Sequence, residues 1–182
     1  MQPIFVTERL ILRPLQLADA PFIQKLAGEK DIASTTLSIP HPYPDGAAES
    51  FIAATHERYS KNLGSTFALI SKETNELLGC AGMHIVSDYN RAELAYWIGK
   101  PYWGHGYATE AVQRMMEYGF DELKLNRLWA AALARNPASS AVMQKNGMKY
   151  EGKLVQHIKK WGEYEDLVYY GITISEYETA LR

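Results

Sequence analysis

One segment with helical periodicity, flanked by two apolar strand-like segments, constrains the fold of this chain most strongly. Apolar side chains recur at helical spacing after residue 107, at Ala108, Ala111, Val112, Met115, Met116, Phe120 and Leu123. The segment "AELAYWIG" (92–99) precedes this helix and "RLWAAALA" (127–134) follows it. A strand–helix–strand unit of this length normally makes a right-handed parallel crossover. We therefore expect one parallel strand connection near the middle of the chain.

The remaining strand-like segments are separated by short turns, which is typical of antiparallel strands. "TERLILRPL" (Thr7–Leu15), "TFALIS" (66–71) and "LLGCAGMHIV" (77–86) come before the crossover. "KYEGKLVQHIKKWGEYEDLVYYGIT" (149–173) reads as two strands around Trp161 and Gly162. We expect a mixed α/β fold (α+β) whose central, mostly antiparallel sheet has about seven strands and is flanked by about four helices. The length favours a single domain over 1–182.

Helix-end signals locate further helices along the chain. Asp19 is expected to cap the first helix and Asp45 the second. Asn136 is the expected N-cap of a helix that ends before Gly147. Ser175 and Glu178 can form a capping box on a final short turn.

Composition excludes several classes of partner and site. The net charge of −2 and the pI of about 6.2 argue against a broad nucleic-acid or anionic-membrane surface. A single cysteine, Cys80, permits no intrachain disulfide, and the first residues lack the apolar region of a signal peptide. The five histidines have no metal-ligand spacing. We expect a cytoplasmic protein with no metal site and no membrane or nucleic-acid partner.

The loop "WGHGYATEA" (Trp103–Ala111) has the form of an anion-binding turn before a helix. A P-loop would need Lys-Ser/Thr after its last glycine, and none follows here. A dinucleotide fingerprint would need a third small residue where Thr109 stands. On the loop alone, a plain strand-to-helix turn with Gly104 and Gly106 at positive φ is also consistent with the sequence.

The wider context of this loop resembles a known family. "ELAYWIGKPYWGHGYATEA", followed by "RLWAAALARNPASSAVMQKNGMKYEG", is similar to the GNAT N-acetyltransferase superfamily. "TERLILRPLQLADA", "SIPHPYP" and "YEGKLVQHIKKWGEYEDLVYYGI" further resemble its RimJ/RimL-like branch, so the similarity covers nearly the whole chain. It implies a GNAT-like fold and an acyltransferase. The enzyme would transfer acetyl from acetyl-coenzyme A (acetyl-CoA) directly to a primary amine of a protein N-terminus or small molecule. The exposed edge strands and the C-terminal strand pair leave both a monomer and a homodimer open.

The resemblance also implies which residues hold the cosubstrate. Acetyl-CoA would lie between the strands at Glu93–Gly99 and Arg127–Ala134. The pantetheine arm would contact the backbone of Trp97, Ile98 and Gly99. The pyrophosphate would bind at Trp103, Gly104, His105, Gly106, Tyr107, Ala108 and Thr109. Asn136 and Ser139 match the family's N-x-x-S pattern at the thioester end of the arm.

Two positions depart from the family pattern. Trp103 stands where Arg or Gln is usual, so phosphate binding would rely on backbone N–H groups and on His105. Met143 stands where many members have a tyrosine that protonates the leaving thiolate. These departures keep open an alternative, an acyl-CoA-binding sensor or scaffold without turnover.

Amine acetylation needs a group that removes a proton, because α-amines titrate near pH 8 and lysine amines near pH 10.4. Glu93 is the candidate general base, directly or through water. The alternative is a solvent-exposed carboxylate or a partner for Arg91. Ser139 is the candidate hydrogen-bond donor to the thiolate, although it could simply bond to its helix cap. The resemblance places the acceptor beside His41, Tyr43, Trp161 and Tyr164.

The loop interpretation can be tested by comparing substitutions in it. Gly104→Val or Gly106→Val should weaken coenzyme A binding about 10-fold or more, because valine is strained at positive φ. Trp103→Gln should weaken it much less. Calorimetric titration with coenzyme A measures each effect, and a larger loss in Trp103→Gln would contradict a loop that binds through its backbone.

Overall fold

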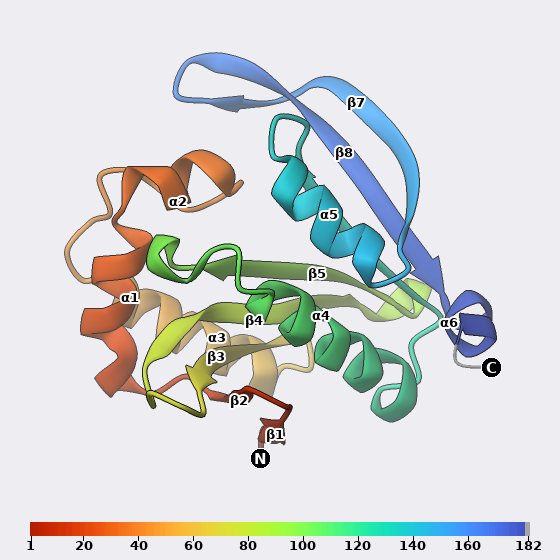
Figure 1. The fold of residues 1–182 in the computed structure, drawn as a ribbon, viewed down its shortest axis with the longest axis horizontal. Coiled ribbons are helices and arrows are strands. Elements are labelled where there is room, and N and C mark those ends of the chain that lie inside the picture. The colour runs from red at the N-terminus through yellow and green to blue at the C-terminus, as the bar shows by residue number, and fades with distance from the viewer. Residues whose placement is uncertain (181–182) are drawn as a thin grey trace.

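A computed structural model describes residues 1–180, and their strands form a single sheet (Figure 1). The spatial order of the eight strands is β1-β2-β3-β4-β5-β6-β8-β7. Their bounds are Phe5–Val6 (β1), Leu10–Pro14 (β2), Gly64–Ser71 (β3), Leu77–Val86 (β4), Arg91–Ile98 (β5), Arg127–Leu133 (β6), Lys149–Lys160 (β7) and Glu163–Thr173 (β8). Neighbouring strands are antiparallel except for β5 and β6, which are parallel. The expected mixed sheet with one parallel crossover is confirmed, and β1 is the additional strand.

Helices cover both faces of the sheet, and they are more numerous than the sequence indicated. Their bounds are Ala20–Ala27 (α1), Lys30–Thr35 (α2), Ala47–Ser60 (α3), Tyr107–Glu117 (α4), Pro137–Lys145 (α5) and Ile174–Ala180 (α6). A π-helical turn, Tyr118–Glu122, extends α4. No helix within residues 1–180 has the length and apolar character needed to cross a membrane.

Two hydrophobic clusters lie on opposite faces of the sheet, because neighbouring residues of a strand point in opposite directions. Cys80 packs in the cluster with α1 and α3, whereas Ala81 packs in the cluster with α4. The α4 cluster contains the stripe of apolar side chains that the sequence predicted, including Ala111, Met115 and Phe120. The sheet therefore has a face covered by α1 and α3 and a face covered by α4 and α5 (Figure 1).

The parallel pairing of β5 with β6 is short. It is registered only at Arg91↔Arg127, Ala92↔Leu128 and Glu93↔Trp129. After Glu93, β5 continues to Ile98 on β4 alone, while β6 continues on β8 alone. We call the space between the two strands beyond this last pair the gap.

Helix caps agree with the sequence at one place and differ at two others. Asn136 is the N-cap of α5, and its side chain accepts from Ser139 N. Asp45 is not the cap of α3, because Gly46 occupies that position with a left-handed backbone, φ 75°. The capping box of the last helix is formed by Thr173 and Glu176, two residues before the expected pair.

Asp19 lies at the N-cap of α1 but bonds outward to β2. Its carboxylate accepts two hydrogen bonds from the Arg13 guanidinium, each at 2.7 Å, and one from Gln16 N at 2.8 Å. Asp19 is only 4% exposed. Removing it would leave the Arg13 charge and the Gln16 N–H without these partners.

We therefore expect Asp19→Ala to lower the free energy of unfolding by about 2 kcal/mol. Glu57→Ala is the matched control, because Glu57 forms an exposed pair with Lys61 and its loss should change stability little. Urea unfolding followed by circular dichroism measures both variants. Equal stability of the two variants would show that the Asp19 contacts contribute nothing.

Candidate functional site

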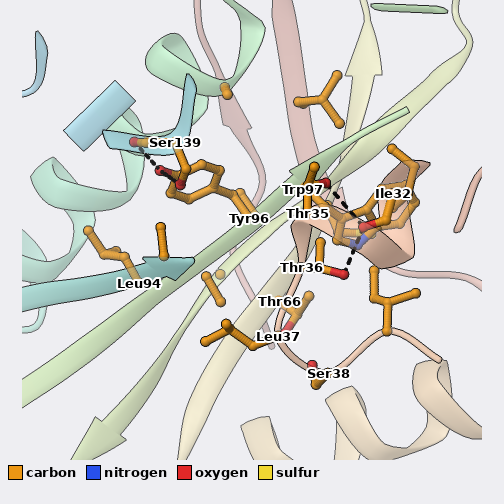
Figure 2. A pocket seen from close by; sticks show the side chains of 18 of the residues that line it. Ile32, Thr35, Thr36, Leu37, Ser38, Thr66, Leu94, Tyr96, Trp97 and Ser139 are labelled. Atoms are coloured by element: carbon orange, nitrogen blue, oxygen red, sulfur yellow. Dashed lines mark hydrogen bonds between the residues drawn. The ribbon is translucent and has the colours of Figure 1, made fainter. Parts of the chain in front are cut away.

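A cavity of about 1480 Å³ extends from the gap to the segment between α2 and α3 (Figure 2). Its walls come from β4, β5 and β6, from α2 and the loop after it, from α3, from the first turn of α4 and from α5. Two features of the cavity suit it to bind a ligand. It contains unpaired strand backbone, and both helices that follow the parallel strands begin beside it.

The unpaired backbone belongs to the end of β5. Gly99 N donates to Leu78 O of β4 at 2.8 Å. Because N–H groups alternate sides along a strand, those of Tyr96 and Ile98 point toward the gap. An extended ligand can pair with these groups as an added strand would.

The glycine loop has the left-handed backbone that its sequence indicated. Gly104 and Gly106 have φ of 78° and 81°, and Gly106 is the N-cap of α4. Trp103 Nε1 donates to Ile98 O at 2.6 Å, so its indole fastens the loop to the end of β5. That donor is engaged and cannot bind a phosphate at the same time. His105 does not line the cavity. Its ring stacks on that of Tyr107, with the two ring centroids 5.9 Å apart.

Glu110 anchors the first turn of α4 to the start of β2. It accepts hydrogen bonds from Thr7 Oγ1 at 2.6 Å and from Arg9 N and Nε at 2.8 and 2.7 Å. Burial alone would raise the pKa of this carboxyl, yet the bonds from Thr7 and Arg9 hold it below its ordinary value. Arg9 Nη1 also donates to His105 O at 2.8 Å, which fixes the glycine loop from outside the cavity.

The N-terminus of α5 lies at the same edge as that of α4, because the carboxyl ends of parallel strands meet at one edge. Asn136 caps α5 and donates from Nδ2 to Thr35 O at 3.1 Å. Arg135 donates to Ser34 O at 2.9 Å. Both contacts tie α2 to the start of α5.

Tyr96 and Ser139 form a hydroxyl pair inside the cavity, as Figure 2 shows. The Tyr96 hydroxyl lies 2.9 Å from Ser139 Oγ, and either hydroxyl can be the donor in this bond. The Tyr96 hydroxyl can also donate to Ser139 O, which is 3.1 Å away. Burial raises the pKa of Tyr96 to about 12, although the hydrogen bond with Ser139 acts in the opposite direction. The Tyr96 hydroxyl therefore keeps its proton at neutral pH.

The sequence did not single out Tyr96, because the tyrosine position in the family pattern lies on α5. Met143, at the position where the family often has one, is fully buried in the α4 cluster at 0% exposure. The usable signal was strand alternation, since Leu94, Tyr96 and Ile98 all face α4 and α5. A tyrosine in that series is directed at the first turn of α5.

Glu93 lies at the last registered pair of β5 and β6, where the gap opens. It lines the cavity, and its backbone is in register with that of His84 on the neighbouring strand β4. Within residues 1–180 its carboxylate has no hydrogen-bond or ion-pair partner, and Arg91 does not pair with it. Burial raises its pKa above the ordinary value. A half-buried carboxylate with a raised pKa is suited to accept a proton near neutral pH.

The residues expected to bind ligands do not all reach the cavity. Those that line it are Trp97, Ile98, Trp103, Gly104, Gly106, Tyr107, Ala108, Thr109, Asn136, Ser139, Glu93 and Tyr43. Gly99 lies outside, packed so closely on Leu26 that a Cβ would come within 2.9 Å. His41 and Trp161 also lie outside, with ring centroids 6.3 Å apart, and Tyr164 is 62% exposed. Arg58 and His84 line the cavity and were not expected.

Comparison with known proteins gives consistent matches. The family model described as "Acetyltransferase (GNAT) domain" matches residues 9–149. The "Uncharacterized N-acetyltransferase p20" of Bacillus licheniformis is 31% identical over 173 residues, covering 94% of this chain and 96% of the relative. The "Putative ribosomal N-acetyltransferase YdaF" of Bacillus subtilis (strain 168) is 30% identical over 177 residues, covering 95% and 96%.

A solved structure extends the likeness to the fold. It is RimL, a ribosomal L7/L12 α-N-protein acetyltransferase, in complex with coenzyme A. It matches with a TM-score of 0.87 at 18% identity, covering 96% of this chain and 99% of that chain.

Proposed function

Because the chain belongs to the GNAT acetyltransferase family, we propose that it uses acetyl-CoA to acetylate a primary amine through the cavity at the gap. Membership of this family establishes that the protein is an acyltransferase. The identity of the cosubstrate and the roles of the individual residues are what we propose. One observation carries the proposal. Glu93, a carboxylate without a partner among residues 1–180 and with a raised pKa, lies where β5 and β6 separate.

The lining of the cavity suits the chemistry of coenzyme A. The gap exposes the backbone N–H groups of Tyr96 and Ile98, which suit the amide-bearing pantetheine arm. The turn at Gly104 and Gly106 opens the N-terminus of α4, which suits a pyrophosphate. When bound, acetyl-CoA supplies the acetyl group as a thioester with a thiolate leaving group.

Glu93 acts as the general base in this proposal. A primary amine is mostly protonated at neutral pH, so the site must remove a proton before nitrogen can attack. Glu93 accepts that proton, directly or through one water. Its raised pKa brings its proton affinity closer to that of the amine.

Ser139 donates a hydrogen bond to the departing sulfur, and Tyr96 positions it. The Ser139 carbonyl is in the first turn of α5 and already accepts a helical hydrogen bond. When the Tyr96 hydroxyl donates to Ser139 Oγ, the serine proton is left free to point into the gap. Tyr96 is therefore a positioning residue, and its raised pKa keeps it a donor.

A second candidate function is an acyl-CoA sensor without turnover. Two observations favour it: Met143 replaces the usual tyrosine and is buried, and the Trp103 indole is bound to Ile98 O. The two candidates separate on one measurement, the release of free thiol from acetyl-CoA in the presence of amines.

We expect Glu93→Gln to lower kcat/KM for thiol release about 10²-fold. The wild-type rate should rise with pH as Glu93 loses its proton, with a midpoint above the ordinary glutamate pKa of about 4.3. This limb of the pH–rate profile should vanish in Glu93→Gln, and the limb that reports deprotonation of the acceptor amine should stay.

Glu178→Gln, at an exposed site, is the matched control. A wild-type rate in Glu93→Gln would remove Glu93 from the mechanism. Coenzyme A binding without turnover on peptides or small amines would favour the sensor.

The hydroxyl pair is tested by a double-mutant cycle. Tyr96→Phe should lower kcat about 10-fold and leave KM for acetyl-CoA nearly unchanged, and Ser139→Ala should have a larger effect. Because Tyr96 acts through Ser139, the double variant should be no slower than Ser139→Ala. Tyr89→Phe, at an exposed tyrosine, is the control. Additive losses would show that Tyr96 acts independently of Ser139.

A further inference from the structure

We infer that the acceptor amine carries a carboxylate and that Arg58 binds this carboxylate in the cavity. The inference rests on the proposed function, since it concerns the acceptor of the same site. It starts from Arg58, a cavity residue that the proposed chemistry does not use.

Arg58 lies in the last turn of α3 and lines the cavity. Its stem packs beside β3, because a Cβ built on Gly64 would lie 3.2 Å from Arg58 Cδ. Gly64 pairs with His84, and His84 pairs with Glu93. Arg58 and Glu93 therefore lie at the two ends of one row across β3, β4 and β5.

The guanidinium of Arg58 has no protein partner within residues 1–180. By contrast, five other arginines each pair with a carboxylate, namely Arg9, Arg13, Arg114, Arg127 and Arg135. Arginine is well matched to carboxylate because its fork of N–H groups can bind both oxygens. An arginine that lines a cavity without such a partner is ready to receive one from a ligand.

The charge of Arg58 favours an anionic group over a cationic one at this end of the row. The charged lining residues of the cavity are Asp45, Arg58, Glu93 and Lys145. A polyamine bound with one amine at Glu93 would place its second ammonium toward Arg58, where like charges repel. A carboxylate in the same place would be attracted.

The distance between the two ends of the row sets how far apart the amine and the carboxylate of the acceptor must be. Neighbouring strands lie about 4.8 Å apart, so Gly64 and Glu93 are separated by roughly 10 Å. Both charged side chains reach into the cavity, which leaves about 5 to 9 Å between amine and carboxylate, or about two extended residues. An α-amino acid is too short. Longer amino acids fit, and so does a peptide N-terminus with an acidic second residue.

The test compares acceptors that share one amine and differ in the distal group. The small probes are 6-aminohexanoic acid, its amide and 1,6-diaminohexane, and the peptide probes carry Glu or Gln at the second position. We expect wild-type kcat/KM to favour the carboxylate over its amide about 10-fold or more. The ratio should fall to about 1 in Arg58→Met, and Arg58→Glu should favour the diamine. The probe set with the larger ratio identifies a small molecule or a peptide as the source.

Lys61→Met is the matched control, because it removes a charge near the end of α3 outside the cavity lining and should keep the wild-type ratio. Equal rates for acid and amide in the wild type would overturn the inference. So would a preference for the acid that persists in Arg58→Met.

Binding separates this inference from the proposed function. Calorimetry on the coenzyme A-loaded protein can compare N-acetyl-6-aminohexanoic acid with its amide. Tighter binding of the acid that is lost in Arg58→Met would support the inference even if no amine were acetylated. In that outcome the proposed function fails and the Arg58 contact stands. Equal binding of the two compounds in the wild type would overturn the contact.

Discussion

The short parallel pairing of β5 and β6 is the constraint on which the rest of the site depends. Three registered pairs hold the strands together, and after Glu93 each strand continues with only one neighbour. Backbone N–H and C=O groups without partners are unfavourable inside a protein. At the end of β5 these groups have other surroundings. Ile98 O accepts a hydrogen bond from the Trp103 indole, and the N–H groups of Tyr96 and Ile98 face the cavity. The separation of two strands thus produces both the cavity and the position of the candidate base.

Local signals in the sequence were sufficient for much of this arrangement. Helical spacing located α4, paired end signals located α5, and the glycine turn has the predicted positive φ. Signals that depend on distant partners were not readable. Tyr96 meets Ser139 across 43 residues, and Arg58 reaches the row of Glu93 only through the pairing of β3, β4 and β5. Asp45 was preferred over Gly46 as a cap because side-chain capping is commoner than a glycine in the left-handed region.

Glu93 and Glu110 show how the same side chain is adapted to different purposes. Both are partly buried, and burial raises the pKa of each. Glu110 receives hydrogen bonds from Thr7 and Arg9 that lower its pKa again, so it stays charged and holds α4 to β2. Glu93 has no such donors within the described chain, and its pKa stays raised. The difference lies in neighbouring donors, which is why residue type alone could not assign either role.

Strand alternation has a consequence for the order in which molecules enter and leave. Glu93 and His84 lie on the face of the sheet toward Arg58 and α3, whereas Tyr96 bonds to Ser139 on the face of α5. The candidate base and the hydroxyl pair are thus on opposite sides of one strand. Two reactants approaching from these sides meet at the gap without crossing each other's path. Under the proposed function neither would need to leave before the other arrives, so this geometry would suit a ternary complex that assembles in either order.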